Sequence, residues 1–127
     1  MRALAKIDQF YKQILRVFNA EKKRLIKQLI IIKMHADWCE ASKMIAPKYT
    51  SLKNKFEGNA ILFLELDLTD PNQAAQWAAT LKIYNLTNHK ETGQILVIDG
   101  ENRFVLDKLH KNMLFSDMVK SVQKYLG

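Results

Sequence analysis

One stretch of the chain, ADWCEASKMIAPKY at residues 36–49, holds the residue types best suited to chemistry. Cys39 is the only cysteine among 127 residues, and Trp38 precedes it directly. Ser42 stands three positions further on, where the second sulfur of a CxxC redox pair would lie. If a helix begins near Cys39, its free backbone N–H groups and its dipole favour the thiolate. The stretch therefore predicts an accessible nucleophilic thiol that has no partner for an internal disulfide.

Each of these residues also has a simpler interpretation. A lone cysteine is commonly a small buried hydrophobic residue, although the WCxxS string favours a solvent-reachable thiol at Cys39. Ser42 is most simply a first-turn helix residue with a local hydrogen bond. His35 ends an apolar run, which fits a structural histidine better than a catalytic base. If His35 or Lys43 lies close to the thiol, it lowers the pKa of Cys39 further, whereas Glu40 acts in the opposite direction.

Composition excludes several other classes of site. The three histidines lie far apart with no metal-ligand spacing, so we predict neither a zinc site nor a cofactor. One cysteine needs no oxidising compartment, and no apolar run approaches the roughly 20 residues that cross a bilayer. The N-terminus has no recognisable signal peptide. These observations favour a cytoplasmic protein without a transmembrane segment.

The positive charge is concentrated at one end of the chain. Residues 1–33 carry nine Lys and Arg against two acidic residues, which accounts for the whole net charge of +7. Apolar residues at steps of three and four over 4–18 predict an amphipathic helix there. Its basic face is solvated in the simplest interpretation. Alternatively, residues 1–27 attach to an anionic surface such as a membrane or an acidic protein. A nucleic-acid partner is disfavoured, because no stacking motif accompanies the basic cluster.

Periodicity predicts alternating helices and strands along a single domain of residues 1–127. A basic amphipathic helix at 1–27 precedes a core at 28–127. Apolar runs predict buried strands at 29–34, 60–68, 94–99 and 103–109, with a hairpin turn at 99–102. Helices are expected from Cys39 to about Phe56, from Asp70-Pro71 onward, and after a cap at Asn112 or Ser116. The order α-β-α-β-α-β-β-α predicts a central mixed sheet with helices on both faces.

The segment LIIIKMHADWCEASKMIAPKY at residues 29–49 resembles thioredoxin, in which a strand leads into A-x-W-C-G-P-C and then K-M-I-A-P. FLELDLTDPNQAAQW and ILVIDGENRFV resemble the elements that follow in that family. The resemblance covers roughly residues 25–127. It implies the thioredoxin fold, a three-layer α/β/α arrangement around a mixed sheet of about four strands. The N-terminal amphipathic helix is an addition to that core.

The resemblance also marks what this chain lacks. Ser42 replaces the resolving cysteine, and Lys33 stands at the position of the family's buried acid. The family's cis-proline would fall at Thr92-Gly93, and the only prolines are Pro47 and Pro71. Sequence alone leaves open whether Lys33 points inward, where it must be paired or neutral, or outward.

Two functions follow as expectations. In the first, the chain is a protein-binding or redox-regulatory module without dithiol reductase turnover. Its partner would bind at a groove formed by Trp38, Cys39 and Gly93, which Glu40, Ala41 and Thr92 flank. In the second, the chain is a monothiol disulfide oxidoreductase or isomerase that forms mixed disulfides through Cys39. Whether the chain is an enzyme therefore stays open.

Overall fold

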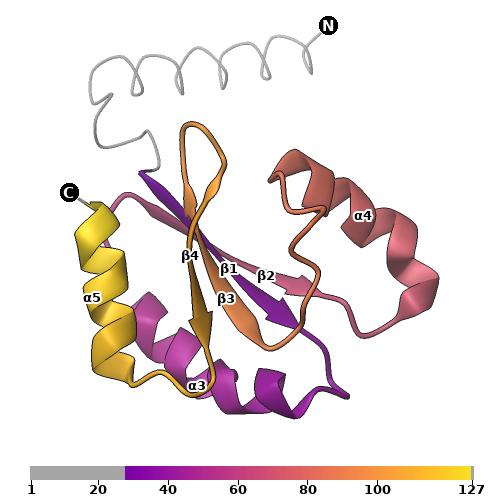
Figure 1. The fold of residues 1–127 in the computed structure, drawn as a ribbon, viewed down its shortest axis with the longest axis horizontal. Coiled ribbons are helices and arrows are strands. Elements are labelled where there is room, and N and C mark those ends of the chain that lie inside the picture. The colour runs from indigo at the N-terminus through magenta and orange to yellow at the C-terminus, as the bar shows by residue number, and fades with distance from the viewer. Residues whose placement is uncertain (1–27, 127) are drawn as a thin grey trace, which may run out of the picture.

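The computed structural model of the chain describes residues 28–126 (Figure 1). The predicted helix and possible anionic-surface contact at residues 1–27 lie outside the described residues. The elements run β1 (Leu29–His35), α3 (Glu40–Lys55), β2 (Ile61–Asp67), the short 3-10 helix η1 (Pro71–Gln73), α4 (Ala74–Ile83), β3 (Gln94–Asp99), β4 (Val105–His110) and α5 (Phe115–Leu126). This order confirms the α/β pattern expected from the apolar periodicity over this part of the chain.

The four strands form one mixed sheet in the order β2-β1-β3-β4. β1 and β2 are parallel, because α3 carries the chain back across the sheet between them. β3 runs antiparallel to β1, and a hairpin joins it to antiparallel β4. The carboxyl ends of β1 and β2 therefore meet at one end of the sheet, where α3 also begins.

Alternation along the strands separates two apolar cores. Leu29 and Ile31 of β1 pack with α3 and α5, and Ile30, Ile32 and Met34 face the other layer with α4. Figure 1 shows α3 and α5 on one side of the sheet and α4 on the other. A strand that is apolar on both faces is expected in the middle of a three-layer α/β/α domain. The predicted layered architecture is thus confirmed for residues 28–126.

The helix expected from Asp70-Pro71 onward begins with the 3-10 helix η1, and α4 itself starts at Ala74 with Gln73 as its N-cap.

Two further boundaries also differ from the sequence prediction. β4 begins at Val105 and not at residue 103, because Arg103 adopts a positive φ of 56° and still belongs to the hairpin turn. α5 begins at Phe115, and the Met118 amide donates to the carbonyl of Leu114. Neither of the two predicted capping residues therefore stands at the N-cap. Local turn geometry decides both boundaries, and the apolar pattern does not report it.

The side chain of Lys48 in α3 forms hydrogen bonds with the turn between β4 and α5. Its Nζ donates to the carbonyl oxygens of Lys111, at 2.9 Å, and Met113, at 2.7 Å. We expect Lys48→Met to lower the free energy of unfolding by about 1–3 kcal/mol, because both acceptors lose a charged donor. Urea titration measures this change. Lys53→Met, at an exposed position of the same helix, is the matched control and should stay within about 0.5 kcal/mol of the wild type; equal effects of the two substitutions would contradict the assignment.

Candidate functional site

Cys39 lies at the junction between β1 and α3, as the sequence predicted. It is the N-cap residue of α3, with φ −101° and ψ 116°, and its carbonyl accepts from the amides of Ser42 and Lys43. The Cys39 amide itself donates to Ala36 at 3.0 Å, which closes a tight turn after the strand. The thiol is free and partly exposed. This position directs the sulfur toward solvent at the amino end of a 16-residue helix.

Polar neighbours lower the pKa of the Cys39 thiol below its ordinary value. The Thr92 hydroxyl is the largest cause, and the Ser42 hydroxyl and the amides of Ser42 and Ala41 act in the same direction, while burial raises the pKa. His35 and Lys43, which were the sequence candidates for this effect, are not among the causes.

This assignment predicts how alkylation of Cys39 depends on pH. The iodoacetamide rate should rise through a midpoint below that of a free cysteine, because only the thiolate reacts. Thr92→Val, which removes the hydroxyl and keeps the shape, should move the midpoint upward and slow the reaction at pH 7 by about two- to tenfold. Because the pKa of the folded state lies below that of the unfolded state, the thiolate contributes stability that is lost as pH falls through the folded pKa. Thr87→Val, in the preceding loop, is the control; an unchanged midpoint in Thr92→Val would contradict the role of Thr92.

Ser42 is fully buried and occupies the position where a second cysteine would stand. Its hydroxyl accepts a hydrogen bond from the amide of Ala36 at 3.1 Å. That amide is buried and needs an acceptor at the turn between β1 and α3. The interpretation of Ser42 as a locally bonded first-turn residue therefore agrees with the geometry.

Thr92 and Gly93 come from the loop before β3 and meet the first turn of α3. Gly93 has φ +79°, and a Cβ added there would lie 2.4 Å from Cβ of Ala41 and 3.0 Å from the Ser42 nitrogen. The Gly93 amide donates to the Met34 carbonyl at 2.7 Å, which extends the β1–β3 pairing. Only glycine allows the two segments to approach this closely. No peptide bond within residues 28–126 is cis.

Lys33 points inward, toward α3, which decides the orientation that the sequence left open. Its side chain is 7% exposed, and its Nζ lies 3.2 Å from the carboxylate of Glu65 on the adjacent strand. The same Nζ lies 5.6 Å from the ring centroid of Tyr49. Burial, with a smaller contribution from Glu65, raises the pKa of the Tyr49 hydroxyl, which donates to the Leu64 carbonyl. Lys33 is thus a buried basic residue with an acidic partner on the adjacent strand.

His35 contacts an exposed carboxylate and not the thiol. Its Nε2 lies 2.7 Å from Oδ1 of Asp37, and its Nδ1 is buried without a hydrogen-bond partner among the described residues. The pKa shift of Cys39 has no contribution from this imidazole. The structural role that the sequence favours for His35 therefore stays a prediction, with one ring nitrogen bonded and the other unpartnered within residues 28–126.

Trp38 is 66% exposed beside Cys39, and the loop after β2, for which the sequence predicts no role, holds its side chain in place. The indole N–H donates to the Thr69 carbonyl at 3.1 Å, and the Thr69 hydroxyl accepts from the Asp37 amide at 2.9 Å. Asp67 accepts from both the amide and the hydroxyl of Thr69, and these bonds, the hydroxyl first, lower the pKa of its carboxyl. The contact between Thr69 and the turn at Trp38 could have been predicted from the order of the strands. Parallel strands end at the same edge of a sheet, so residues after β2 must meet those after β1.

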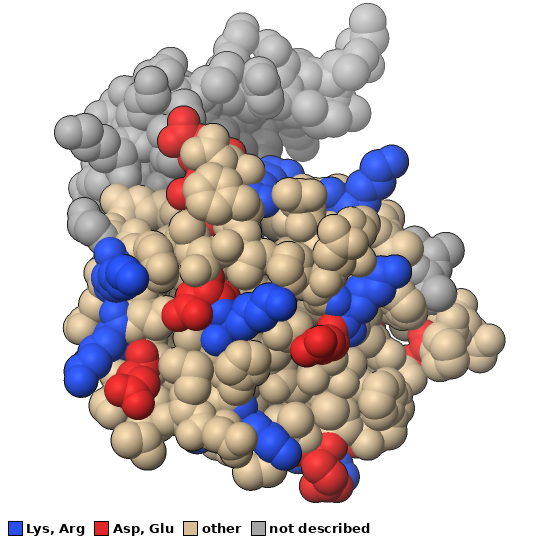
Figure 2. All heavy atoms as spheres, viewed as in Figure 1, with Lys and Arg blue, Asp and Glu red and all other residues tan. Residues whose placement is uncertain are grey.

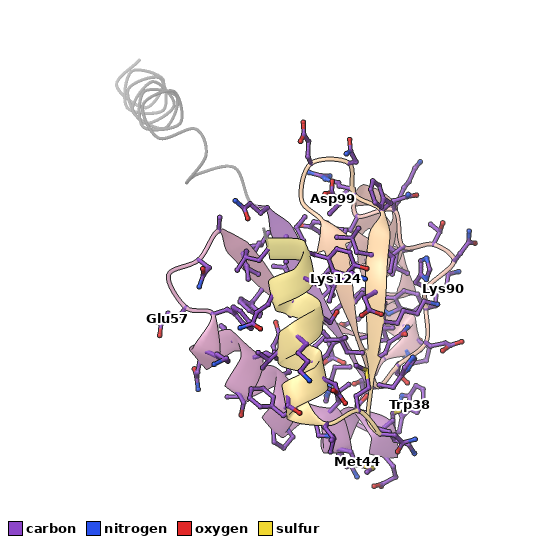
Figure 3. All side chains as sticks on the ribbon, turned by 60° about the vertical axis from the view of Figure 1, so that its left-hand side comes forward. Trp38, Met44, Glu57, Lys90, Asp99 and Lys124 are labelled. Carbon is purple, nitrogen blue, oxygen red and sulfur yellow. The ribbon has the colours of Figure 1, made fainter. Side chains whose placement is uncertain are left out.

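Trp38 and Met44 lie at the same end of the molecule (Figure 3). Figure 3 shows Trp38 and Met44 projecting from the end of the domain opposite Asp99 in the β3–β4 hairpin. Met44 is also exposed. Glu40 and Lys43 form an exposed ion pair at 3.4 Å, which contributes little to stability at such a surface site. Within residues 28–126, no three His, Cys, Asp or Glu side chains gather as metal ligands would.

The chain is similar to known proteins in both sequence and fold. The sequence profile of the family Thioredoxin matches residues 11–108. The chain belongs to the thioredoxin family. A thioredoxin from Gallus gallus is 27% identical over 97 residues, which cover 76% of this chain and 90% of that protein. The thioredoxin of Ophiophagus hannah is 25% identical over 97 residues, with the same coverage.

Solved thioredoxins share the fold at lower identity. The thioredoxin of Malassezia sympodialis superposes with a TM-score of 0.55 and 16% identity, covering 84% of this chain and 85% of that one. A thioredoxin from Nicotiana alata gives 0.54 and 14% identity, covering 90% and 85%. At these identities the likeness establishes the fold and leaves the chemistry to the residues described above. Among the described helices, none is long and apolar enough to cross a membrane.

Proposed function

We propose that this thioredoxin-family protein is a protein-binding or redox-regulatory module that does not turn over as a dithiol reductase. The observation that carries the proposal is the composition of the site: Cys39 is the only cysteine, and the buried Ser42 occupies the place of the second sulfur. Lys33 with its Glu65 partner and the Thr92-Gly93 pair also replace parts of the reductase machinery. Several independent replacements within one active site favour a change of function over a change in the rate of the same reaction.

The thiol–disulfide exchange that remains possible at Cys39 ends at a mixed disulfide with the client. Its thiolate attacks one sulfur of a client disulfide, a bond forms from Cys39 to that sulfur, and the other client sulfur leaves as a thiolate. No electrons have been supplied from outside, so the client disulfide is exchanged for a mixed disulfide. Ser42 has no thiol with which to displace the bound client. Release requires a second thiol, such as glutathione or a client cysteine. If that thiol attacks the client sulfur, it forms a disulfide with the client and Cys39 leaves as a thiolate; if it attacks the Cys39 sulfur, the client leaves as a thiolate and the new thiol stays bound to Cys39.

The partner surface in this proposal centres on the exposed indole of Trp38. The ring is fixed through its N–H to Thr69 and presents an apolar face beside Cys39. Gly93, with no side chain, leaves the backbone of the opposing loop close to the first turn of α3. An exposed and immobilised aromatic residue is typical of an interaction site, because it contributes apolar area with little loss of side-chain entropy.

The alternative function is a monothiol oxidoreductase or isomerase. The pKa of Cys39, which its neighbours hold low, supports this second candidate. In this role, mixed disulfides at Cys39 are intermediates that external thiols resolve, and client disulfides are rearranged. The two candidates differ in what they require of the sulfur: binding survives its loss, and exchange does not.

The first of two assays tests for dithiol turnover, and the second separates the two candidates. The insulin reduction assay with dithiothreitol should show no turnover comparable to a dithiol thioredoxin; comparable turnover would end the first proposal. Partner capture should then be compared among Cys39→Ser, Trp38→Ala and the control Phe104→Ala, an exposed aromatic residue next to the β3–β4 hairpin. Loss of capture in Trp38→Ala alone supports the binding module, and loss in Cys39→Ser supports the monothiol enzyme. Capture that depends equally on Phe104 would remove the argument for this site.

A third proposal concerns residues 1–27, which hold most of the excess positive charge, with eight Lys and Arg against two acidic residues. Figure 2 shows basic and acidic side chains interspersed on the visible face of the described residues. We propose attachment of residues 1–27 to an anionic surface, tested by co-sedimentation with vesicles with and without anionic lipid. Binding should fall as salt increases, and binding that depends on neither lipid charge nor salt would contradict the proposal.

Cytoplasmic location likewise stays a prediction, to be tested by cell fractionation.

A further inference from the structure

β4 is an edge strand whose outer side is accessible. It pairs with β3 alone among the described strands. An open hollow of about 500 Å³ follows this edge, lined by β4 and by Asn85 and His89 of the loop after α4. Figure 1 shows β4 at the front of the sheet with α5 beside it. An exposed edge strand offers unpaired backbone groups to a strand of another chain, and a second copy of the same chain is always at hand.

The outer amides of β4 are already bound by side chains. The Lys108 amide donates to Oδ1 of Asp107 at 2.8 Å, and the His110 amide donates to the sulfur of Met113 at 3.4 Å. Residues two apart on a strand send their amides to the same side, and neither of these amides is directed to β3. A strand approaching β4 from outside would therefore find these two donors occupied.

Asp107 is held in this position from the helix layer. Its second oxygen, Oδ2, accepts a hydrogen bond from the Ser121 hydroxyl of α5 at 2.5 Å. The side chain of Asp107 therefore bridges the edge strand and the helix beside it, with both oxygens engaged. The strand also bulges here, because Val97 pairs with Asp107 while the next residue, Ile98, pairs with Val105. A bulge interrupts the flat ladder that strand addition requires.

In two registers, the charges of β4 also oppose pairing with a second copy. In a continuous two-fold sheet, antiparallel β4 strands place residues of the same face opposite each other. A register centred on Asp107 brings two carboxylates together, and a register centred on Lys108 brings two ammonium groups together. Like charges directly opposite each other destabilise a pair of strands. The hydrogen bonds and the charges thus act in the same direction.

We infer that Asp107 prevents the β4 strands of two copies of this chain from pairing. Its carboxylate binds the Lys108 amide, which a strand of the second copy would otherwise use as a hydrogen-bond donor. In this inference Asp107 closes the edge at the Lys108 amide, while the Met113 sulfur occupies the His110 amide and the bulge interrupts the ladder between them and the hairpin. The inference is independent of the chemistry at Cys39, because neither Asp107 nor Ser121 is among the groups that shift the pKa of its thiol.

The test compares the mass of the full chain in solution under reductant, which prevents a Cys39 disulfide dimer. Multi-angle light scattering should give a monomer for the wild type at all concentrations. Asp107→Leu, which keeps the approximate size and removes both acceptors, should shift with concentration toward the mass of two chains. Ser121→Ala leaves the bond from the Lys108 amide to Asp107 in place and should stay monomeric. A folded Asp107→Leu that remains monomeric, or one that forms assemblies of no fixed size, would overturn the inference.

Amide exchange in the wild type gives an independent readout if Asp107→Leu does not fold. The Lys108 amide should exchange about tenfold or more slowly than an unprotected amide, because its acceptor is a charged carboxylate. Exchange at the unprotected rate would overturn the inference without any variant. In a folded Asp107→Leu at low concentration, this protection should be lost while that of the β3-paired amides is kept; retained protection of the Lys108 amide would also overturn it.

Discussion

Ser42→Cys should convert the protein into a dithiol reductase with measurable turnover. The new sulfur stands at the buried first turn of α3, three residues after Cys39, and can attack a mixed disulfide within the same molecule. Intramolecular attack has a large advantage over attack by an external thiol. We expect insulin reduction to rise by at least about tenfold over the wild type. In the proposed function Lys33 replaces the buried acid of a reductase, so we expect the rate to stay below that of a complete thioredoxin.

The same substitution should destabilise the reduced protein. The Ser42 hydroxyl accepts from the buried Ala36 amide, and sulfur is a weaker acceptor. The expected loss is about 1–2 kcal/mol in urea titration under reductant. The double variant Cys39→Ser/Ser42→Cys is the control, with the new sulfur and no nucleophile, and should show no turnover. A folded Ser42→Cys with unchanged activity would show that another part of the site, and not the missing sulfur, prevents turnover.

Gly93→Ala should give the largest loss of stability among the substitutions proposed for the site. The added Cβ would lie 2.4 Å from Cβ of Ala41 and 3.0 Å from backbone atoms of Ala41 and Ser42, at a positive φ of 79°. Either the loop or the first turn of α3 must move. We expect about 2–4 kcal/mol of destabilisation, the range of overpacking added to the strain of a left-handed alanine. The same shift should separate Thr92 from Cys39 and raise the pKa of the thiol.

Gly58 supplies the matched control for Gly93. It also has a positive φ, of 89°, but an added Cβ meets nothing within 4 Å. Gly58→Ala should therefore cost only the conformational part, about 1–2 kcal/mol, and leave Cys39 alkylation unchanged. Ala41→Gly combined with Gly93→Ala should recover part of the loss, since the nearest clash is removed. Equal effects of the two single alanine substitutions would contradict the close contact at Gly93.

The layered fold was predictable because each buried element has an apolar signature of its own. The run at 29–34 and the hairpin strands alternate with helical patterns, and the structure places them in one mixed sheet. Boundaries were harder where a single backbone angle decides, as at Arg103 with its positive φ. Apolar periodicity carries no information on such an angle, because a surface arginine fits a turn or a strand equally well.

The candidate site was predictable in its centre and not in its support. Position within the strand-to-helix junction followed from the sequence around Cys39, and the neighbourhood of Gly93 followed from the resemblance. The direction of Lys33 depends on strand register, which a shift of one residue reverses. The contacts of Thr69 with Trp38 and Asp37 join positions about 30 residues apart and become visible only once β1 and β2 lie side by side.

The central claim is that Cys39 forms a bond to sulfur that the protein cannot undo alone, and intact-mass spectrometry tests it most directly. Reduced protein, freed of reductant, is mixed with excess oxidised glutathione at two protein concentrations. The account predicts one glutathione adduct per chain on Cys39, absent in Cys39→Ser, which persists at low protein concentration until a thiol is added. The Ser42→Cys variant should lose the adduct by forming an internal disulfide. A wild-type chain that takes up no glutathione, or that sheds its adduct at low concentration without added thiol, would contradict the account.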